Sequence, residues 1–400
     1  MKKRIIAIAA VAMALTTIAT FTITAQDKNE FNPVTTGVTS LSIAPDARGA
    51  SMGDLGAATD PDVNSQFWNA SKYAFAYSSA GVSISYTPWL RKLVNDIALL
   101  NASGYWKFGS EDNQAVSASL RYFTLGEITN YDDQGATLSS VNPYEMAFDV
   151  GYSRKLSEKF SMGVVLRYIY SNLGFNDATD EALSGASAFA ADISGYFTTY
   201  PIIGRNECQW SWGFNISNIG SKVSYDGGTE SAFLPTNLKI GTTFTFPLAD
   251  YHNLAVSLDL NKLLVPTKPR TSDYEEGSAE DSPYWDDLQE WQDMSPITGI
   301  FKSFGDAPGG FSEELKEINL SFGLEYNYNQ QFFLRGGYYY ENAMKGDRKY
   351  FGFGAGFALN VIRLDAAYMI ATAQSSPLDQ TLRFTLTFDM DGIKELLGRR

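Results

Sequence analysis

The chain has 400 residues, of which 44% are hydrophobic, 14% aromatic and 19% charged. Its formal net charge of -14 at pH 7 makes nucleic acid and anionic lipid surfaces poor general partners. The aromatic content excludes a disordered chain, the single cysteine Cys208 excludes an intrachain disulfide, and the single histidine His252 excludes most zinc sites.

The first 25 residues have the pattern of a secretory signal peptide. A basic start over residues 2–4 precedes an apolar run over residues 5–15, and small residues lead up to Ala25. We therefore expect residues 1–25 to be removed, with cleavage within a residue or two of Ala25. No later run is long and apolar enough to predict a membrane-spanning helix.

The next segment, residues 26–77, has no clear strand pattern, although it is punctuated by glycine and partly apolar. We expect it to fill the lumen of the barrel that the rest of the chain predicts. A disordered periplasmic tail is the alternative, and it would leave Met52, Phe67 and Trp68 poorly placed in water. The residues expected to matter most in this plug are Arg48, Gly49, Met52, Gly53, Asp54, Trp68 and Asn69.

From about residue 78 onward, apolar and polar residues alternate. Between residues 144 and 153 the even positions are Tyr, Met, Phe, Val and Tyr, and the odd positions are Glu, Ala, Asp, Gly and Ser. Such alternation predicts strands with one apolar face, and runs of about 9–11 residues can cross a bilayer when tilted. A water-soluble sandwich also alternates, but its strands are typically only about 5–6 residues long.

Fourteen such runs predict an all-β fold, a 14-stranded antiparallel transmembrane β-barrel over residues 78–391. They lie near residues 78–90, 94–107, 113–125, 143–155, 160–171, 187–199, 208–219, 236–246, 252–263, 317–328, 332–341, 350–359, 362–370 and 381–390. An even strand number is typical of single-chain bacterial barrels. Residues 392–400 follow as a C-terminal extension.

The connections alternate between short and long, as in barrels with short periplasmic turns and long outer loops. The short ones are residues 155–159, 247–251, 329–331 and 360–361, and the long ones are 126–142, 172–185, 221–235 and 264–317. This alternation predicts that both termini lie in the periplasm and that the long loops face outward.

The polar faces of the strands predict the lumen. Their charged residues are Arg121, Arg167, Lys239, Arg335, Arg363 and Arg383, with Glu145, Asp149, Asp192, Asp259, Glu325 and Asp365. Because the two signs cancel, we expect a paired network that holds a plug rather than an ion-selective pore. Small residues at positions 352, 354, 356 and 358 leave room for a segment to lie against the wall.

The longest outer connection, residues 264–317, is strongly acidic. Its residues 271–300 contain nine Asp or Glu and no Lys or Arg, and the spacing of its tryptophans predicts a short helix near residues 283–294. We expect a partner-binding surface, because exposed tryptophan is typical of protein interfaces. An equally supported alternative is a loop that folds back over its own barrel. The candidate residues are Trp285, Asp286, Asp287, Trp291 and Phe301.

Enzymatic and metal-dependent functions find little support. Hydrolysis would need an activated nucleophile, and His252 falls at a predicted periplasmic turn. The chain has no Gly-x-Ser-x-Gly elbow and no phosphate-binding Gly-Lys-Ser/Thr loop. The acidic residues of the long loop do not have the spacing of an EF-hand. We therefore predict no catalytic residue, no cofactor and no metal site.

Three runs in the N-terminal segment resemble the signature of the PorV family of the Bacteroidetes type IX secretion system. They are SLSIAPDARG at residues 40–49, MGDLGAAT at 52–59 and NSQFWNASKY at 64–73. The family is similar in fold to the FadL fatty-acid transporters, so the resemblance implies an outer-membrane barrel in contact with lipid.

The resemblance also implies a function. The barrel would bind client proteins with a C-terminal signal domain at the translocon barrel and escort them to a sortase-like surface attachment complex. The alternative is FadL-like uptake of hydrophobic small molecules. A transporter needs an apolar channel, whereas an escort needs a large outward surface, and residues 264–317 favour the escort.

Overall fold

The computed structural model describes residues 31–89, 96–131, 137–173, 185–225, 230–274, 279, 281–372 and 380–392. A single compact unit begins at Phe31. The expected signal peptide, residues 1–25, and the C-terminal extension beyond Gly392 lie outside the described residues.

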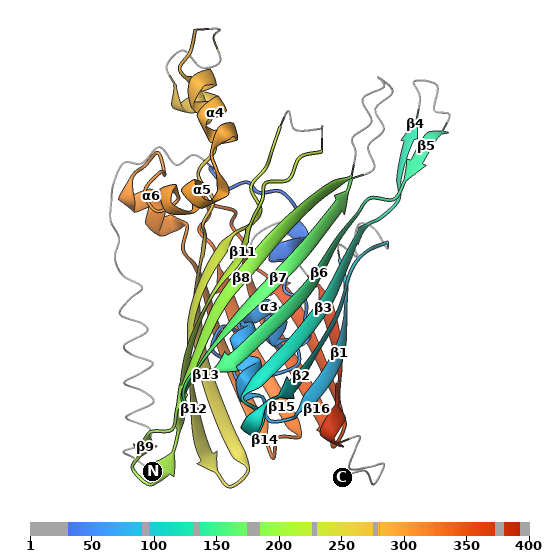
Figure 1. Cartoon of the computed structure of the whole chain (residues 1–400), viewed down its shortest axis with the longest axis vertical. Helices are drawn as coiled ribbons and strands as arrows, with labels where there is room; N and C mark the ends of the chain where they lie inside the picture. The colour runs from blue at the N-terminus through green and yellow to red at the C-terminus, as the bar shows by residue number, and fades with distance from the viewer. Residues whose placement is uncertain are drawn as a thin grey trace. The chain divides into compact units, whose positions relative to one another are not determined.

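Fourteen strands close into an antiparallel β-barrel, which confirms the fold class expected from the alternation (Figure 1). The barrel closes where β1 pairs with β18, with Val82 opposite Phe388. The barrel strands are β1 (Ala80–Pro88), β2 (Ile97–Phe108), β3 (Gln114–Leu125), β6 (Tyr144–Lys155), β7 (Phe160–Asn172), β8 (Ala186–Thr199), β11 (Gln209–Gly220), β12 (Asn237–Ala249), β13 (His252–Leu263), β14 (Asn319–Tyr328), β15 (Phe332–Tyr340), β16 (Lys349–Leu359), β17 (Ile362–Ala371) and β18 (Leu382–Asp389).

The faces of the strands follow the alternation of the sequence. In β6, Phe148 and Val150 are exposed, whereas Glu145 and Asp149 are buried in the lumen. Burying the polar side chains inward leaves an apolar outer surface, as a barrel in lipid requires. The predicted orientation of this strand is thereby confirmed.

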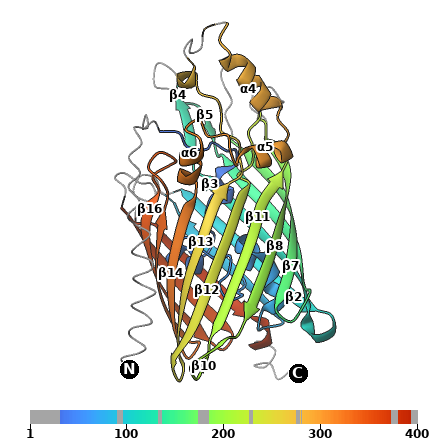
Figure 2. The same ribbon diagram turned by 90° about the vertical axis from the view of Figure 1, so that its left-hand side faces the viewer.

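Long connections gather at one end of the barrel, the loop end, and short turns at the other, the turn end (Figure 1, Figure 2). The elements outside the barrel wall are η4 (Ser110–Asp112), β4 (Ile128–Tyr131), β5 (Thr137–Val141), β9 (Ile202–Ile203), β10 (Asn206–Glu207), η5 (Thr271–Asp273), α4 (Tyr284–Asp293), α5 (Pro296–Lys302) and α6 (Phe311–Lys316). The described helices include none that is long and apolar enough to cross a membrane.

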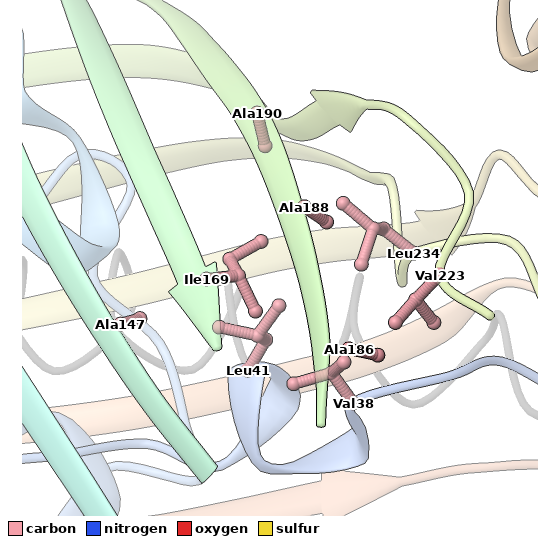
Figure 3. Close-up of a cluster of buried hydrophobic side chains, with 9 residues drawn as sticks. All are labelled: Val38, Leu41, Ala147, Ile169, Ala186, Ala188, Ala190, Val223 and Leu234. Atoms are coloured by element: carbon pink, nitrogen blue, oxygen red, sulfur yellow. The ribbon is translucent and has the colours of Figure 1, made fainter. Parts of the chain in front are cut away.

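The described N-terminal residues 31–77, here the lumen segment, run inside the barrel (Figure 2). Their short helices are η2 (Thr39–Ser42), α2 (Ala47–Ser51), α3 (Ser65–Trp68) and η3 (Ala70–Phe75). α2 contacts β15 to β18, and η3 contacts β6, β7 and β8. Figure 3 shows Val38 and Leu41 packed against Ile169 and Ala188 of the wall. Apolar contacts thus fix the start of the segment near the loop end.

Candidate functional site

The helix α2 packs closely against the barrel wall because small residues lie on both sides of the contact. Asp46 caps it by accepting a hydrogen bond from the Gly49 amide at 2.8 Å. A Cβ atom added at Gly352 would lie 2.5 Å from the Ala50 carbonyl oxygen, and one added at Gly354 would lie 2.5 Å from the Ser51 Cβ. The small residues of β16 therefore admit the backbone of the lumen segment.

Trp68 joins α2 to α3 inside the barrel. It is buried, and its Nε1 donates to Asp46 Oδ1 at 2.6 Å. A Cβ at Gly49 or Gly56 would collide with the indole ring. The Lys239 ammonium of the wall lies 4.4 Å from the ring centroid, within range of a cation–π interaction. The glycines of the segment thus make room for its largest side chain.

Arg48 lies at the centre of a buried ion network. Its guanidinium donates to Glu325 at 2.8 and 3.0 Å and to Asp62 at 2.9 Å. Glu325 also pairs with Arg335 at 2.5 Å, and Arg335 pairs with Asp365 at 2.7 Å. Charges buried from water are stable only when they are paired in this way.

Other wall charges bind the backbone of the lumen segment. Arg121 donates to the Ser40 and Ile43 carbonyls at 2.6 and 3.1 Å, and Arg383 donates to the Ala44 carbonyl at 2.6 Å. Asp259 of β13 accepts from the Gly56 and Ala57 amides at 2.8 and 2.9 Å. A second ion cluster joins Arg167 to Asp149 and Asp192 at 2.7 and 3.0 Å. The pairing of lumen charges expected from their balance is confirmed at these two clusters.

The remaining residues singled out in the N-terminal segment also contact the wall. Met52 is buried. Gly53 has φ of +79° and lies so close to β15 that a Cβ would be 2.6 Å from the Tyr338 carbonyl oxygen. Asp54 accepts from the Tyr350 hydroxyl at 2.5 Å, and Asn69 donates to the Gly195 carbonyl at 2.9 Å. Each of these residues therefore positions backbone against the barrel.

The tryptophans of the long loop occupy different environments, although both lie on α4, which confirms the expected helix. Trp291 is only 6% exposed, packs edge-on against Phe233 and donates from Nε1 to the Pro266 carbonyl at 3.0 Å. Trp285 is 47% exposed. Trp291 therefore positions the loop, while Trp285 stays half-exposed and donates from Nε1 to the Ala279 carbonyl at 3.0 Å.

The acidic residues beside Trp285 face solvent. Asp286 and Asp287 are exposed, and Asp287 accepts from the Tyr274 hydroxyl at 2.6 Å. Residues 275, 276 and 280 of the acidic run lie outside the described residues.

Several large apolar side chains are exposed at the loop end, and the sequence analysis predicts only one of them as a binding residue. Phe301 was among the candidates and is 74% exposed. With Ile297, Phe304, Phe311 and Leu315, which are also exposed, it makes up what we call the α5–α6 apolar set. The i, i+4, i+7 spacing of Ile297, Phe301 and Phe304 is the helical signal that could have revealed it.

Ion pairs at the barrel rim fix α6. Lys262 of β13 pairs with Glu314 and Glu317 at 2.9 and 2.5 Å, and Lys345 pairs with Glu313 at 2.5 Å. Although burial opposes the shift, hydrogen bonds from Lys345 and the Gly309 amide lower the pKa of Glu313. At pH values above the ordinary pKa of a glutamate, about 4.3, the pairing of Glu313 therefore stabilises the rim. This stabilisation is lost as the pH falls through the lowered pKa.

Comparison with protein families gives one match. A model of the family described as type IX secretion system protein PorV matches residues 25–270. Curated protein sequences give no match.

Among solved structures, the chain is similar to a deltaS2S3 mutant of the monoaromatic hydrocarbon channel TodX (11% identity, TM-score 0.49, 86% of this chain and 98% of that one). It is also similar to the Ralstonia pickettii toluene transporter TbuX (13%, 0.47, 88% and 97%) and to a Pseudomonas aeruginosa FadL homologue (12%, 0.42, 90% and 100%). The family match covers more than half of the sequence, and the chain is therefore an outer-membrane β-barrel that belongs to the PorV family of type IX secretion system proteins.

Proposed function

We propose that this barrel binds client proteins with a C-terminal signal domain as they leave the type IX translocon barrel. It then delivers them to the sortase-like surface attachment complex. Membership of the PorV family supports a role in secretion. The observation that carries the docking role is the α5–α6 apolar set, because large apolar side chains exposed outside the barrel wall are typical of protein-binding surfaces.

The lumen segment supports docking over passage through the barrel. Wall charges bind its backbone, and Trp68 and the Arg48 network occupy the interior. A folded client would have to displace all of these contacts. We therefore propose that the segment acts as a plug and that clients bind only at the loop end.

Removing two members of the apolar set tests the docking role. The double substitution Phe301→Ala and Phe311→Ala removes two exposed rings. If each ring is a hot spot worth about 2 kcal/mol or more, binding of a purified client signal domain to the detergent-solubilised barrel should weaken at least about tenfold. In cells, clients should accumulate in the periplasm.

Two controls separate docking from folding. Leu156→Ala with Tyr251→Ala removes exposed side chains at the turn end and should leave capture unchanged. Trp291→Ala removes a buried side chain and should weaken capture only by disordering the loop, which hydrogen exchange would detect. Normal capture and secretion by the Phe301 and Phe311 variant would refute the docking role. If uptake of hydrophobic compounds fell instead, FadL-like transport would be favoured.

We further propose that the loop end faces the cell exterior and the termini the periplasm. A Cys208→Ser background removes the native thiol. A cysteine replacing the exposed Gln289 of α4 should then react with an impermeant maleimide on intact cells, and one replacing the exposed Glu158 at the turn end should react only after lysis. The reverse labelling pattern would overturn this orientation.

A further inference from the structure

A cavity of about 310 Å³ lies between the lumen segment and the wall near the loop end. Leu41, Phe67 and Trp68 of the lumen segment line one side. The other side is formed by polar residues of β11 to β14, among them Asn215, Lys239, Asn261 and Asn319. Its volume is at the lower limit of small-ligand sites, about 300 Å³.

The four polar residues form one row across four adjacent strands. Asn215 is paired with Lys239, Lys239 with Asn261, and Asn261 with Asn319. Because neighbouring strands lie about 4.8 Å apart, the row presents three amides and one ammonium at regular spacing. All four residues are more than nine-tenths buried.

Each asparagine of this row has a side-chain atom without a protein hydrogen-bond partner. These atoms are Asn215 Oδ1, Asn261 Nδ2 and Asn319 Oδ1. A buried polar group left unpaired is costly, and native proteins leave few of them. Three such groups in one row, all lining the same cavity, indicate that it holds something polar.

Most of the charged side chains around the cavity are held in ion pairs. Arg167 binds Asp149 and Asp192, Lys345 binds Glu313 and Glu317, and Arg348 binds Glu341. Lys239 donates to the Asp54 carbonyl at 3.2 Å and lies over Trp68. Asp54, whose Oδ1 accepts no hydrogen bond and lies 3.6 Å from the Arg383 guanidinium, also lines the cavity. The unpaired groups of the row are uncharged amide donors and acceptors, and a carboxylate is present beside them, so the cavity suits a neutral ligand better than an anion.

We propose that this cavity binds a small, free, uncharged polyhydroxylated molecule of about monosaccharide size. Each hydroxyl can both donate and accept, so it can satisfy an amide oxygen and an amide nitrogen of the row. The aromatic side chains Phe67, Trp68 and Tyr339 supply apolar surface for the carbon face of such a ring.

The test uses the full-length barrel in a detergent without a sugar headgroup. D-glucose, D-galactose and D-mannose are titrated separately by calorimetry, and at least one should bind saturably. Asn261→Leu keeps a similar volume but removes one amide from the row. It should weaken that binding about tenfold or more, as expected when a ligand loses a buried hydrogen bond.

A matched control is Asn101→Leu, which changes a buried lumen asparagine of β2 that donates to Ser103 and does not line the cavity. It should bind the sugar as the native barrel does. If Asn261→Leu loses heat-modifiable migration on gels, Asn319→Leu replaces it. The proposal fails if none of the sugars binds saturably, or if the row variant binds as tightly as the native barrel. Tighter binding of inorganic phosphate than of any sugar would also overturn it.

Discussion

A barrel that lacks residues 31–70 is expected to insert into the membrane but to conduct ions in a planar bilayer, whereas the full chain stays closed. Fourteen strands enclose a lumen between the size that side chains can fill and that of aqueous porins with 16–18 strands. The deletion removes Trp68 and the Arg48 side chain from this space. Wall charges such as Glu325 and Arg383 would then face water.

A second deletion identifies which part of the chain closes the lumen. Removing residues 281–306 takes away α4 and α5 and leaves the lumen segment in the chain. This barrel should remain closed. Negligible conductance in the barrel without residues 31–70 would mean that wall side chains and outer loops close the lumen by themselves.

Arg48→Met is expected to release the lumen segment from the wall while the barrel remains intact. The change takes the ion pair with Arg48 away from Asp62 and leaves Glu325 with Arg335 alone. Breaking a buried ion pair in this way costs about 3–5 kcal/mol. Hydrogen exchange of the amides in residues 46–60 should therefore accelerate about a hundredfold or more, with the strands unaffected.

Two further variants show whether the missing charge causes this release. Asp62→Asn added to Arg48→Met removes the carboxylate that lost its ion pair with Arg48, so much of the protection should return. Lys302→Met breaks the exposed pair with Glu290 on the loop helices and should change stability by less than about 1 kcal/mol. Unchanged exchange in Arg48→Met would show that apolar contacts alone hold the segment.

The strands could be predicted from the sequence because their signal is local. The alternation of apolar and polar residues along β6 or β14 depends only on which face of the strand meets lipid. It can therefore be seen within a window of about ten residues. The burial of Trp291 could not be predicted, because it depends on Phe233, a residue of a different connection. An isolated helix carrying two tryptophans contains no sign of which one will be covered.

The asparagine row escaped prediction for a related reason. Asn215, Lys239, Asn261 and Asn319 are spread over more than a hundred residues, and they become neighbours only through the register of four strands. The register between strands depends on the length of every intervening connection, so it cannot be predicted from the sequence of any single strand. The balance of lumen charges was predictable because it needs only the inward face of each strand.

The small inward face of β16 limits how this strand can change in length. Its outward neighbours are Phe351, Phe353 and Phe357, and they alternate with the residues that admit α2. Because the side-chain period of a strand is two, an insertion of one residue would turn these rings toward the lumen segment. Two inserted residues preserve the faces, and insertions in the connection at residues 341–348 leave them untouched. A single-residue insertion or deletion therefore preserves the two faces of β16 when it falls in a connection, but not when it falls in the middle of the strand.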